Sequence, residues 1–314
     1  MSKLICMGDC IIDFLPSAPG ELTYTAKAGG APANVCAAVA KLGADAFYFG
    51  KLSNDNFGAF LLSELKKYGI RTDLTVVDGN FKTGLVFVDL YENGERDFFF
   101  YRDNPADANL EPDEVHSRFF EKGDVLHFCS ISLMESPTKR AHRRAIDYAR
   151  ENGCLISFDV NVRMHLWKDA EKLKSAVYEF LPLADIIKVT DDEILLLTGI
   201  KDEKEAVKAL FGRADNAKIV FLTRGENGSA AYDRNLNCVD MPAKAFAVVD
   251  TTGAGDCFIG SIIYKLLNKE AALTVDGVKD AMSFAVNACA LVISKKGGMN
   301  AMPALPEVAA LSEV

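Results

Sequence analysis

The stretch Asp250-Thr-Thr-Gly-Ala-Gly-Asp256 runs directly into CFIGSIIYKLL (257–267), so a glycine-rich turn precedes an amphipathic helix. Gly253 and Gly255 allow the backbone to approach an anion closely, and the first turn of a helix points unpaired N–H groups at it. Asp256 is placed where its carboxylate could accept a proton from an attacking hydroxyl. The stretch predicts a phosphoryl-transfer site. The competing interpretation is that Asp256 caps the helix and the glycines only form the turn.

A second glycine-rich turn lies near the other end of the chain, in Ala28-Gly-Gly-Ala-Pro-Ala-Asn34. Gly29 and Gly30 would open the turn, and Asn34 would begin a helix of small residues. Such a turn can present backbone N–H groups and one amide to a polyhydroxy ligand, or it can be a plain turn with an Asn N-cap. The dinucleotide-binding and Walker fingerprints are both absent, which argues against a nicotinamide enzyme and a Walker-type NTPase.

Between these turns, short apolar strands alternate with amphipathic helices almost from end to end. This alternation predicts one α/β domain over residues 1–314, with a doubly wound, mostly parallel central sheet flanked by helices. The predicted strands cover residues 4–8, 46–50, 125–129, 154–160, 185–189, 218–222 and 229–233. The predicted helices cover residues 34–42, 56–68, 137–151, 170–180, 191–198, 254–267 and 277–294.

Two stretches, about 9–27 and 83–107, do not follow this alternation of strands and helices. Two strand-like runs join through Glu92-Asn-Gly-Glu95, and Asn-Gly between apolar runs predicts a hairpin. We expect these pieces to form a small, discontinuous β lid. Strand alternation would place Phe98, Phe100 and Arg102 on one face of it and Phe99 and Tyr101 on the other.

The composition is typical of a soluble cytoplasmic protein. Lys+Arg 35 against Asp+Glu 44 gives a net charge of −9, with no basic run, so neither nucleic acid nor a membrane is an expected partner. The N-terminal apolar run is interrupted by Asp9 and Asp13, unlike a signal peptide, and no segment reaches the ~18 apolar residues of a membrane span. The eight cysteines are scattered without a CxxC pair, and the four histidines have no metal-ligand spacing.

The two glycine-rich motifs, AGGAPANVCAAVAKLG (28–43) and DTTGAGDCFIGS (250–261), resemble the two signatures of the PfkB carbohydrate kinases, the ribokinase family. The resemblance extends over the whole chain and includes GDCIIDF (8–14), FDVNVR (158–163), LTRGENG (222–228) and KKGGMNAMP (295–303). It implies a ribokinase-like fold and an ATP-dependent sugar kinase.

The resemblance also implies roles for individual residues. Asp256 would be the catalytic base, and the backbone of Gly253, Ala254 and Gly255 would form the anion hole. Arg163 would reach either the substrate or the transferring phosphate, unless it is only an exposed surface residue. The residues expected to bind the sugar are Asp9, Asp13, Gly29, Gly30, Asn34, Phe98, Tyr101, Arg102 and Asn161.

The nucleotide would lie beside Thr223, Gly225 and Gly228, with Asn287 near the adenine. The family's N-x-x-E motif appears here as Thr190-Asp-Asp-Glu193, so only Glu193 is expected to contact Mg²⁺, through water. Lys188 would supply charge to the nucleotide phosphates. A monovalent cation such as K⁺ would be bound by Asp250, Thr252 and Gly297.

Among family members, the motifs are most similar to those of bacterial fructokinases and aminoimidazole riboside kinases. We predict phosphorylation of D-fructose to fructose 6-phosphate, with aminoimidazole riboside as the alternative substrate. A different class of function, a non-catalytic sugar sensor, is disfavoured because both Asp13 and Asp256 are present. The resemblance further suggests a homodimer that forms through the lid.

Overall fold

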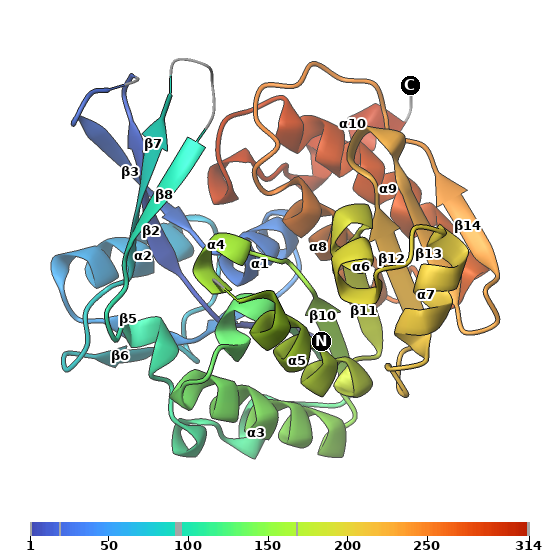
Figure 1. Ribbon diagram of the computed structural model, residues 1–314, viewed down its shortest axis with the longest axis horizontal. Coiled ribbons are helices and arrows are strands. Elements are labelled where there is room, and N and C mark those ends of the chain that lie inside the picture. The colour runs from blue at the N-terminus through green and yellow to red at the C-terminus, as the bar shows by residue number, and fades with distance from the viewer. Residues whose placement is uncertain (1, 19, 92–95, 168, 313–314) are drawn as a thin grey trace.

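The computed structural model describes residues 2–18, 20–91, 96–167 and 169–312 and is built around an eight-stranded sheet (Figure 1). The strand order is β14-β13-β12-β11-β10-β9-β1-β4. Six strands are parallel: β1 (Leu4–Met7), β4 (Ala46–Phe49), β9 (Val125–Cys129), β10 (Leu155–Asp159), β11 (Ile186–Thr190) and β12 (Ile219–Thr223). Two antiparallel strands, β13 (Ser229–Asp233) and β14 (Cys238–Met241), extend the sheet at one edge.

Helices cover both faces of this sheet, and each face has its own hydrophobic core. The first core contains α1 (Ala31–Lys41), α2 (Asn56–Lys67), α8 (Ala254–Leu267) and α9 (Val275–Ile293). The second contains α3 (Pro137–Glu151), α5 (Ala170–Phe180), α6 (Asp191–Thr198) and α7 (Glu203–Phe211). The predicted doubly wound, mostly parallel fold is confirmed.

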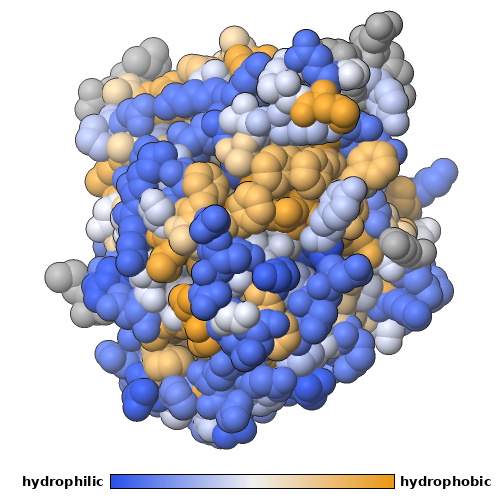
Figure 2. All heavy atoms as spheres, turned by 90° about the vertical axis from the view of Figure 1, so that its left-hand side faces the viewer, coloured by the Kyte–Doolittle hydropathy of each residue, from blue (hydrophilic) through white to orange (hydrophobic). Residues whose placement is uncertain are grey.

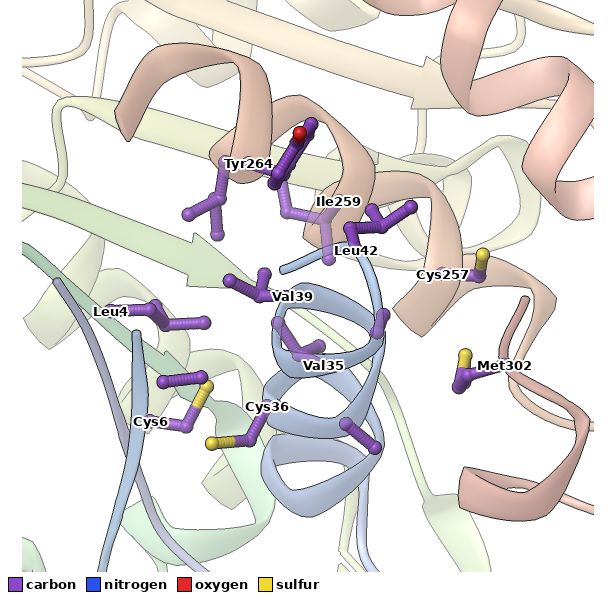
Figure 3. Packing of buried hydrophobic residues seen from close by; sticks show 14 of the residues in the cluster. Leu4, Cys6, Val35, Cys36, Val39, Leu42, Cys257, Ile259, Tyr264 and Met302 are labelled. Carbon is purple, nitrogen blue, oxygen red and sulfur yellow. The ribbon is translucent and has the colours of Figure 1, made fainter. Parts of the chain in front are cut away.

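The packing of α1 against α8 depends on small side chains. Figure 3 shows Val35 and Val39 of α1 below Ile259 of α8, with Leu4 of β1 to their left. A Cβ atom added at Gly260 would lie only 2.8 Å from Cβ of Ala38. The glycine therefore lets the two helices approach closely.

A separate four-stranded sheet projects from the core at the upper left of Figure 1. Its order is β3-β2-β7-β8, from β2 (Ile11–Pro16), β3 (Tyr24–Gly29), β7 (Leu85–Leu90) and β8 (Arg96–Tyr101). Strands β2 and β7 are parallel, and the outer pairs are antiparallel. The small sheet predicted from these two segments is present. The predicted turn at 92–95 lies outside the described residues.

The remaining elements were not predicted from the sequence. They include a two-stranded sheet of β5 (Lys51–Ser53) and β6 (Val76–Asp78) and the helices α4 (Met164–Trp167) and α10 (Leu305–Ser312). The 3₁₀ turns are Ala106–Ala108, Pro112–Glu114, Ser117–Phe119, Ser130–Leu133, Leu181–Leu183, Gly225–Asn227 and Met299–Ala301. None of the helices in the described ranges has the length and apolar character needed to cross a bilayer.

Candidate active site

The polar residues expected to act together follow parallel strands that end at the same edge of the sheet. Asp9 follows β1, Asn161 follows β10, and Thr190 ends β11. The chain leaves β1 toward β4 on one side, whereas β9 lies on the other, so the strand order reverses at β1. Ligands of doubly wound folds bind at such a reversal, beyond the carboxyl ends of the strands.

Asp256 lies at this edge, and its carboxylate is fixed by an amide from α1. Asn34 Nδ2 donates a hydrogen bond to Asp256 Oδ2 at 2.8 Å, and both residues are buried. Asn34 is one helical turn before Ala38, and Asp256 is one turn before Gly260, so the close helix contact brings the two side chains together. Burial first, and then the charge of Asp159, raise the pKa of Asp256 to about 6.

The positions at which α1 and α8 begin rule out helix capping by Asn34 and Asp256, which the sequence had left open. Helix α1 begins at Ala31, with Pro32 in its first turn, so Asn34 is not the N-cap residue. The N-cap of α8 is Gly253, so Asp256 is not the helix cap either. Helix capping therefore explains neither side chain.

Gly253, the N-cap residue of α8, and Gly255, in its first turn, are favoured for different reasons. Gly253 has φ 81°, a left-handed conformation that favours glycine, and no side chain in the described part of the chain caps the helix there. At Gly255 a Cβ atom would lie 3.1 Å from Nζ of Lys188. The Ala254 N–H group donates to the Thr251 carbonyl at 3.2 Å, so the first turn of α8 offers the N–H groups of Gly255 and Asp256 beside a buried ammonium group.

Lys188 is one half of a buried ion pair. Its Nζ atom lies 3.0 Å from Oδ1 of Asp159, and the two side chains are 5% and 0% exposed. Burial lowers the pKa of Lys188, but the charges of Asp159 and Glu193 outweigh it and hold the pKa above its usual range. Lys188 therefore carries its full positive charge at the base of the turn.

Two further carboxylates, Asp9 and Asp13, lie against the second glycine-rich turn. A Cβ atom at Gly29 would be 2.3 Å from Asp13 Oδ2, and one at Gly30 would be 2.5 Å from the Asp9 carbonyl oxygen. Burial raises the pKa of each carboxyl group to about 6, and the charge of Asp9 further raises that of Asp13. Glycine at both positions keeps the backbone in contact with the two acids.

Two arginines partly offset these charges. The positive charge of the exposed Arg163 lowers the pKa values of Asp9, Asp13 and Asp256. Arg102 forms a buried ion pair with Asp107, a partner that the sequence analysis did not assign. Arg102 is thus held mainly by the protein, although its Nη1 atom lacks a partner in the described structure.

Buried polar atoms without a hydrogen-bond partner among the described residues concentrate in this region. Those on the segments around the site are Asp9 Oδ1, Asn34 Oδ1, Arg102 Nη1, Asp107 Oδ1, Ser132 Oγ, Asp159 Oδ2 and Asn161 Oδ1. Trp167 Nε1 and Ser229 Oγ also lack a partner. Buried polar groups in proteins are normally satisfied, so a group of such atoms indicates a place where a polar ligand completes the hydrogen bonding. Asn161 also has φ 39°, a strained conformation often found at ligand sites.

The projecting sheet presents two different faces. Asp13, Val86 and Phe100 are directly paired across its strands, so they share the face that meets the core. On this face Phe100 stacks on His165 of α4, with ring centroids 5.3 Å apart and an interplanar angle of 16°. His165 was not assigned a role from the sequence, although it follows Arg163 closely.

Tyr101 lies on the opposite face, which corrects its assignment to the sugar site within one chain. Its ring packs edge-on against Phe87 at 5.3 Å, and Phe87 in turn stacks on Phe14 at 4.6 Å. Tyr101 is 67% exposed and Phe99 is 47% exposed. Figure 2 shows hydrophobic side chains gathered on this side of the molecule. The side chain of Phe98 lies outside the described part of the structure.

The residues expected to bind the nucleotide occupy neighbouring loops. Glu193 accepts hydrogen bonds from the N–H groups of Thr190 at 2.8 Å and Val162 at 2.7 Å, so it also closes a capping box at the start of α6. Thr223 ends β12, and Gly225 and Gly228 follow with φ 55° and 86°. Asn287 is buried on α9, whose Cys289 Sγ donates to the Ala254 carbonyl at 3.3 Å.

The three residues assigned to a monovalent cation are brought together by one carboxylate. Asp250 Oδ1 accepts from the N–H and Oγ1 of Thr252 at 3.0 and 2.7 Å, and Asp250 Oδ2 accepts from the N–H of Gly297 at 3.1 Å. Gly298, the next residue, would place a Cβ atom 2.5 Å from Asn34 Oδ1. This loop therefore joins the two glycine-rich turns.

The sequence and fold match known carbohydrate kinases along the whole chain. The chain is 39% identical over 309 residues to a probable fructokinase-5 of Arabidopsis thaliana, covering 96% of this chain and 94% of the relative. An ATP-bound fructokinase structure from Xylella fastidiosa superposes with a TM-score of 0.91 at 30% identity, covering 99% and 98% of the two chains. A double-mutant fructokinase from Vibrio cholerae O395, in its fructose, ADP and potassium ion bound form, gives 0.90 at 33% identity, covering 99% and 98%.

A third structure, aminoimidazole riboside kinase from Salmonella enterica complexed with aminoimidazole riboside and an ATP analogue, has a TM-score of 0.88 at 26% identity and covers 100% of both chains. The model of the pfkB family carbohydrate kinases matches residues 1–305. This protein therefore belongs to the pfkB family of carbohydrate kinases.

Proposed function

We propose that this protein transfers the γ-phosphoryl group of ATP to a primary hydroxyl of D-fructose, which yields fructose 6-phosphate. The observation that carries the proposal is the placement of the buried Asp256 carboxylate, 2.8 Å from the Asn34 amide, at the N-terminus of α8. The relatives named fructokinase, at 35–39% identity, favour fructose as the acceptor.

In this proposal, Asp256 accepts the proton of the attacking hydroxyl group. A pKa of about 6 leaves it ionised at neutral pH yet more basic than an ordinary aspartate. The N–H groups of Gly253 and Gly255 and the Lys188 ammonium group offset the charge on the transferring phosphoryl group, whereas the Ala254 N–H group, predicted to act with them, already donates to the Thr251 carbonyl. Arg163, just before α4, would contact either the sugar or the phosphate.

The sugar would be held by the acidic pocket beside β1. Asp9 and Asp13 can each accept hydrogen bonds from two hydroxyl groups, and the free Oδ1 atoms of Asn34 and Asn161 can accept others. Gly29 and Gly30 keep the backbone close to these acids, and Arg102 adds a positive charge. Phe100 would cover the sugar from the lid; a role for Phe98 stays a prediction.

We propose that the nucleotide is ATP with Mg²⁺, bound beside Lys188, Thr223, Gly225, Gly228 and Asn287. The described residues contain no cluster of three or more His, Cys, Asp or Glu side chains that could hold a metal alone. Mg²⁺ would therefore rely on phosphate oxygens and water, with Glu193 contacting it through water. When bound, it neutralises charge between the β- and γ-phosphates.

The loop that joins Asp250, Thr252 and Gly297 is our candidate for a K⁺ site. The Asp250 carboxylate and the Thr252 hydroxyl group lie on one short turn and could supply two oxygen ligands to the cation. The potassium-bound fructokinase from Vibrio cholerae supports a monovalent cation in a related structure. A cytoplasmic location stays a prediction from the cysteine pattern.

A second substrate, aminoimidazole riboside, is kept because a kinase for it shares the whole fold with this chain. Both substrates carry a hydroxymethyl group on a five-membered ring, so the acidic pocket suits either. A screen of ADP release with fructose, ribose, 2-keto-3-deoxygluconate, nucleosides and aminoimidazole riboside tests the proposal. We expect the highest kcat/KM with fructose. A higher value with the riboside would reassign the substrate, and no ADP release with any of them would favour a non-catalytic sensor.

A further inference from the structure

A buried carboxylate beneath the anion-binding turn has no role in the mechanism above. Asp159 ends β10 and is directly paired with Lys188 of β11 in the parallel ladder, so the two side chains project from the same face of the sheet. Its Oδ1 atom lies 3.0 Å from Lys188 Nζ and also accepts from the N–H of Asn161 at 3.2 Å. Its Oδ2 atom is buried without a partner among the described residues.

The ammonium group of Lys188 is confined between this carboxylate and the start of α8. A Cβ atom at Gly255 would lie 3.1 Å from Lys188 Nζ and 3.6 Å from its Cε. A side chain at position 255 would crowd the ammonium group, which glycine leaves in place. The Lys188 ammonium group therefore lies against the first turn of α8, with the Asp159 carboxylate as its ion-pair partner.

A lysine buried this deeply needs a partner to stay protonated. Burial lowers the pKa of Lys188, and Asp159 is the largest of the influences that raise it. The other ionisable groups around the ammonium are Glu193 of α6, Asp256 of α8, His127 and Cys129 of β9, and Cys289 of α9. None of these other groups forms an ion pair with Lys188 within the described part of the chain, whereas Asp159 does.

We propose that Asp159 is a positioning residue for phosphoryl transfer: it holds the Lys188 ammonium group in place against the anion-binding turn and keeps it charged. The inference rests on the proposed function, because Lys188 matters only if phosphate binds at this turn. Asp159 touches neither the sugar nor the phosphate in this scheme and acts through Lys188.

The test is Asp159→Asn, which keeps the size of the side chain and one acceptor oxygen but removes the charge. We expect kcat to fall at least about tenfold. Lys188 should also lose its proton more readily in the variant, so kcat should fall at a high pH at which the wild-type protein keeps its activity. A wild-type kcat, or a pH profile without this new loss, would overturn the proposal.

The chain offers a matched control in a second buried aspartate–lysine pair, at the opposite, amino end of the same sheet. Asp124 lies just before β9, and its Oδ2 atom is 3.3 Å from Lys3 Nζ. Asp124→Asn should lower the melting temperature as much as Asp159→Asn, with kcat unchanged. An equal loss of kcat in both variants would mean that Asp159 is merely structural, and this would overturn the proposal.

A double-mutant cycle with Lys188→Met separates an effect through Lys188 from any other. In that background Asp159→Asn should change kcat by less than about twofold, because the group it positions is gone. A full tenfold loss there would overturn the proposal. If Lys188→Met does not fold, the pH profile of Asp159→Asn decides the question by itself.

Binding of a non-hydrolysable ATP analogue, measured by calorimetry, separates this inference from the proposed function. If the wild-type protein phosphorylates none of the sugars tested, the proposed function fails. The role of Asp159 stands in that case if Asp159→Asn weakens analogue binding at least about fivefold and Asp124→Asn does not. It fails if both variants bind the analogue as the wild-type protein does.

Discussion

The reactive carboxylate of Asp256 is stabilised mainly by one neutral hydrogen bond, and this makes its ionisation sensitive to Asn34. The pKa of Asp256 is about 6, so kcat/KM should fall about tenfold per pH unit below that value as the base takes up its proton. The amide N–H of Asn34 stabilises the charged form, so Asn34→Ala should raise this pKa and move the acidic limb to higher pH. A pH–rate profile of the two proteins measures the shift; a limb that moves to lower pH would contradict the assignment.

Removing the charge of Asp256 tests its role as a base more directly. Asp256→Asn should lower kcat at least about 100-fold, because the amide cannot accept the hydroxyl proton. Sugar affinity and the melting temperature should change little, since the residue remains able to bond to Asn34. Near-normal turnover with intact sugar binding would show that another group takes the proton.

The sequence suggested which residues belong to the candidate site, but it did not predict which of them contact one another. The turn at 250–256 could be singled out from its glycines and its acid, and its resemblance to a family signature, together with that of the turn at 28–34, suggested its role. The ion pairs Lys188–Asp159 and Arg102–Asp107 could not, since each depends on strand register or on a loop that brings distant side chains together. The same applies to Tyr101: alternation placed it opposite Phe100, but only the packing on Phe87 shows which face is turned away from Asp13.

At the scale of elements, the contact of α1 with α8 sets the distance between the amide and the carboxylate. A larger residue at Gly260 would push against Ala38, whose Cβ atom would be 2.8 Å from the new Cβ, and against the Val35 carbonyl oxygen at 3.3 Å. Gly260→Val should destabilise the protein by about 1–3 kcal/mol and lower kcat by separating Asn34 from Asp256. Thermal melting and steady-state kinetics would check this, with Gly260→Ala expected to have a smaller effect on both. Unchanged kcat in a destabilised Gly260→Val variant would show that the helix spacing does not control the site.

The stack of Phe100 on His165 is the aromatic contact described between the projecting sheet and the segment that carries Arg163. If the sheet closes over the sugar, this contact stabilises the closed form and excludes water from the acceptor. His165→Ala should raise KM for the sugar about three- to tenfold and leave ADP affinity unchanged, because the loss of one ring contact costs about 0.5–1.5 kcal/mol. His116→Ala is the control, since His116 contacts Phe119 in an edge-on ring pair with centroids 5.2 Å apart on another part of the surface. Equal changes in KM for both variants would exclude a role in closure.

Elements with a clear period or a glycine-rich boundary could be predicted, and short ones could not. Helix α8 was predicted with the observed bounds, because Gly253 marks its start and its apolar face is continuous. Helix α1 begins three residues before the predicted start, because Pro32 fits the first helical turn and glycine at position 30 tolerates φ 113°. Strands β5 and β6 are three residues each, too short for a period-2 pattern to be visible.

At the scale of the molecule, the local charge at the start of α8 is opposite in sign to the net charge of the chain. The chain carries a net charge of −9, yet the turn at the start of α8 lies beside the Lys188 ammonium group and at the positive end of the helix. A polyanionic nucleotide would therefore find a locally positive site on an acidic protein, with the carboxylates of Asp9 and Asp13 kept on the sugar side. In the proposed function, this separation of charge would orient the sugar and the nucleotide on opposite sides of the site.

The aromatic outer face of the projecting sheet supports our expectation that two chains associate through it. Large exposed apolar side chains on a monomer commonly mark an interface, and here Phe99, Tyr101 and Phe57 lie on or beside the stacked pair Phe14–Phe87. Light scattering should give the mass of two 34.2 kDa chains for the wild-type protein. Tyr101→Lys should give the mass of one, because a buried lysine without a partner opposes association. Leu195→Lys, a similarly exposed apolar position on α6, should leave the mass unchanged; a wild-type mass of one chain would exclude the dimer.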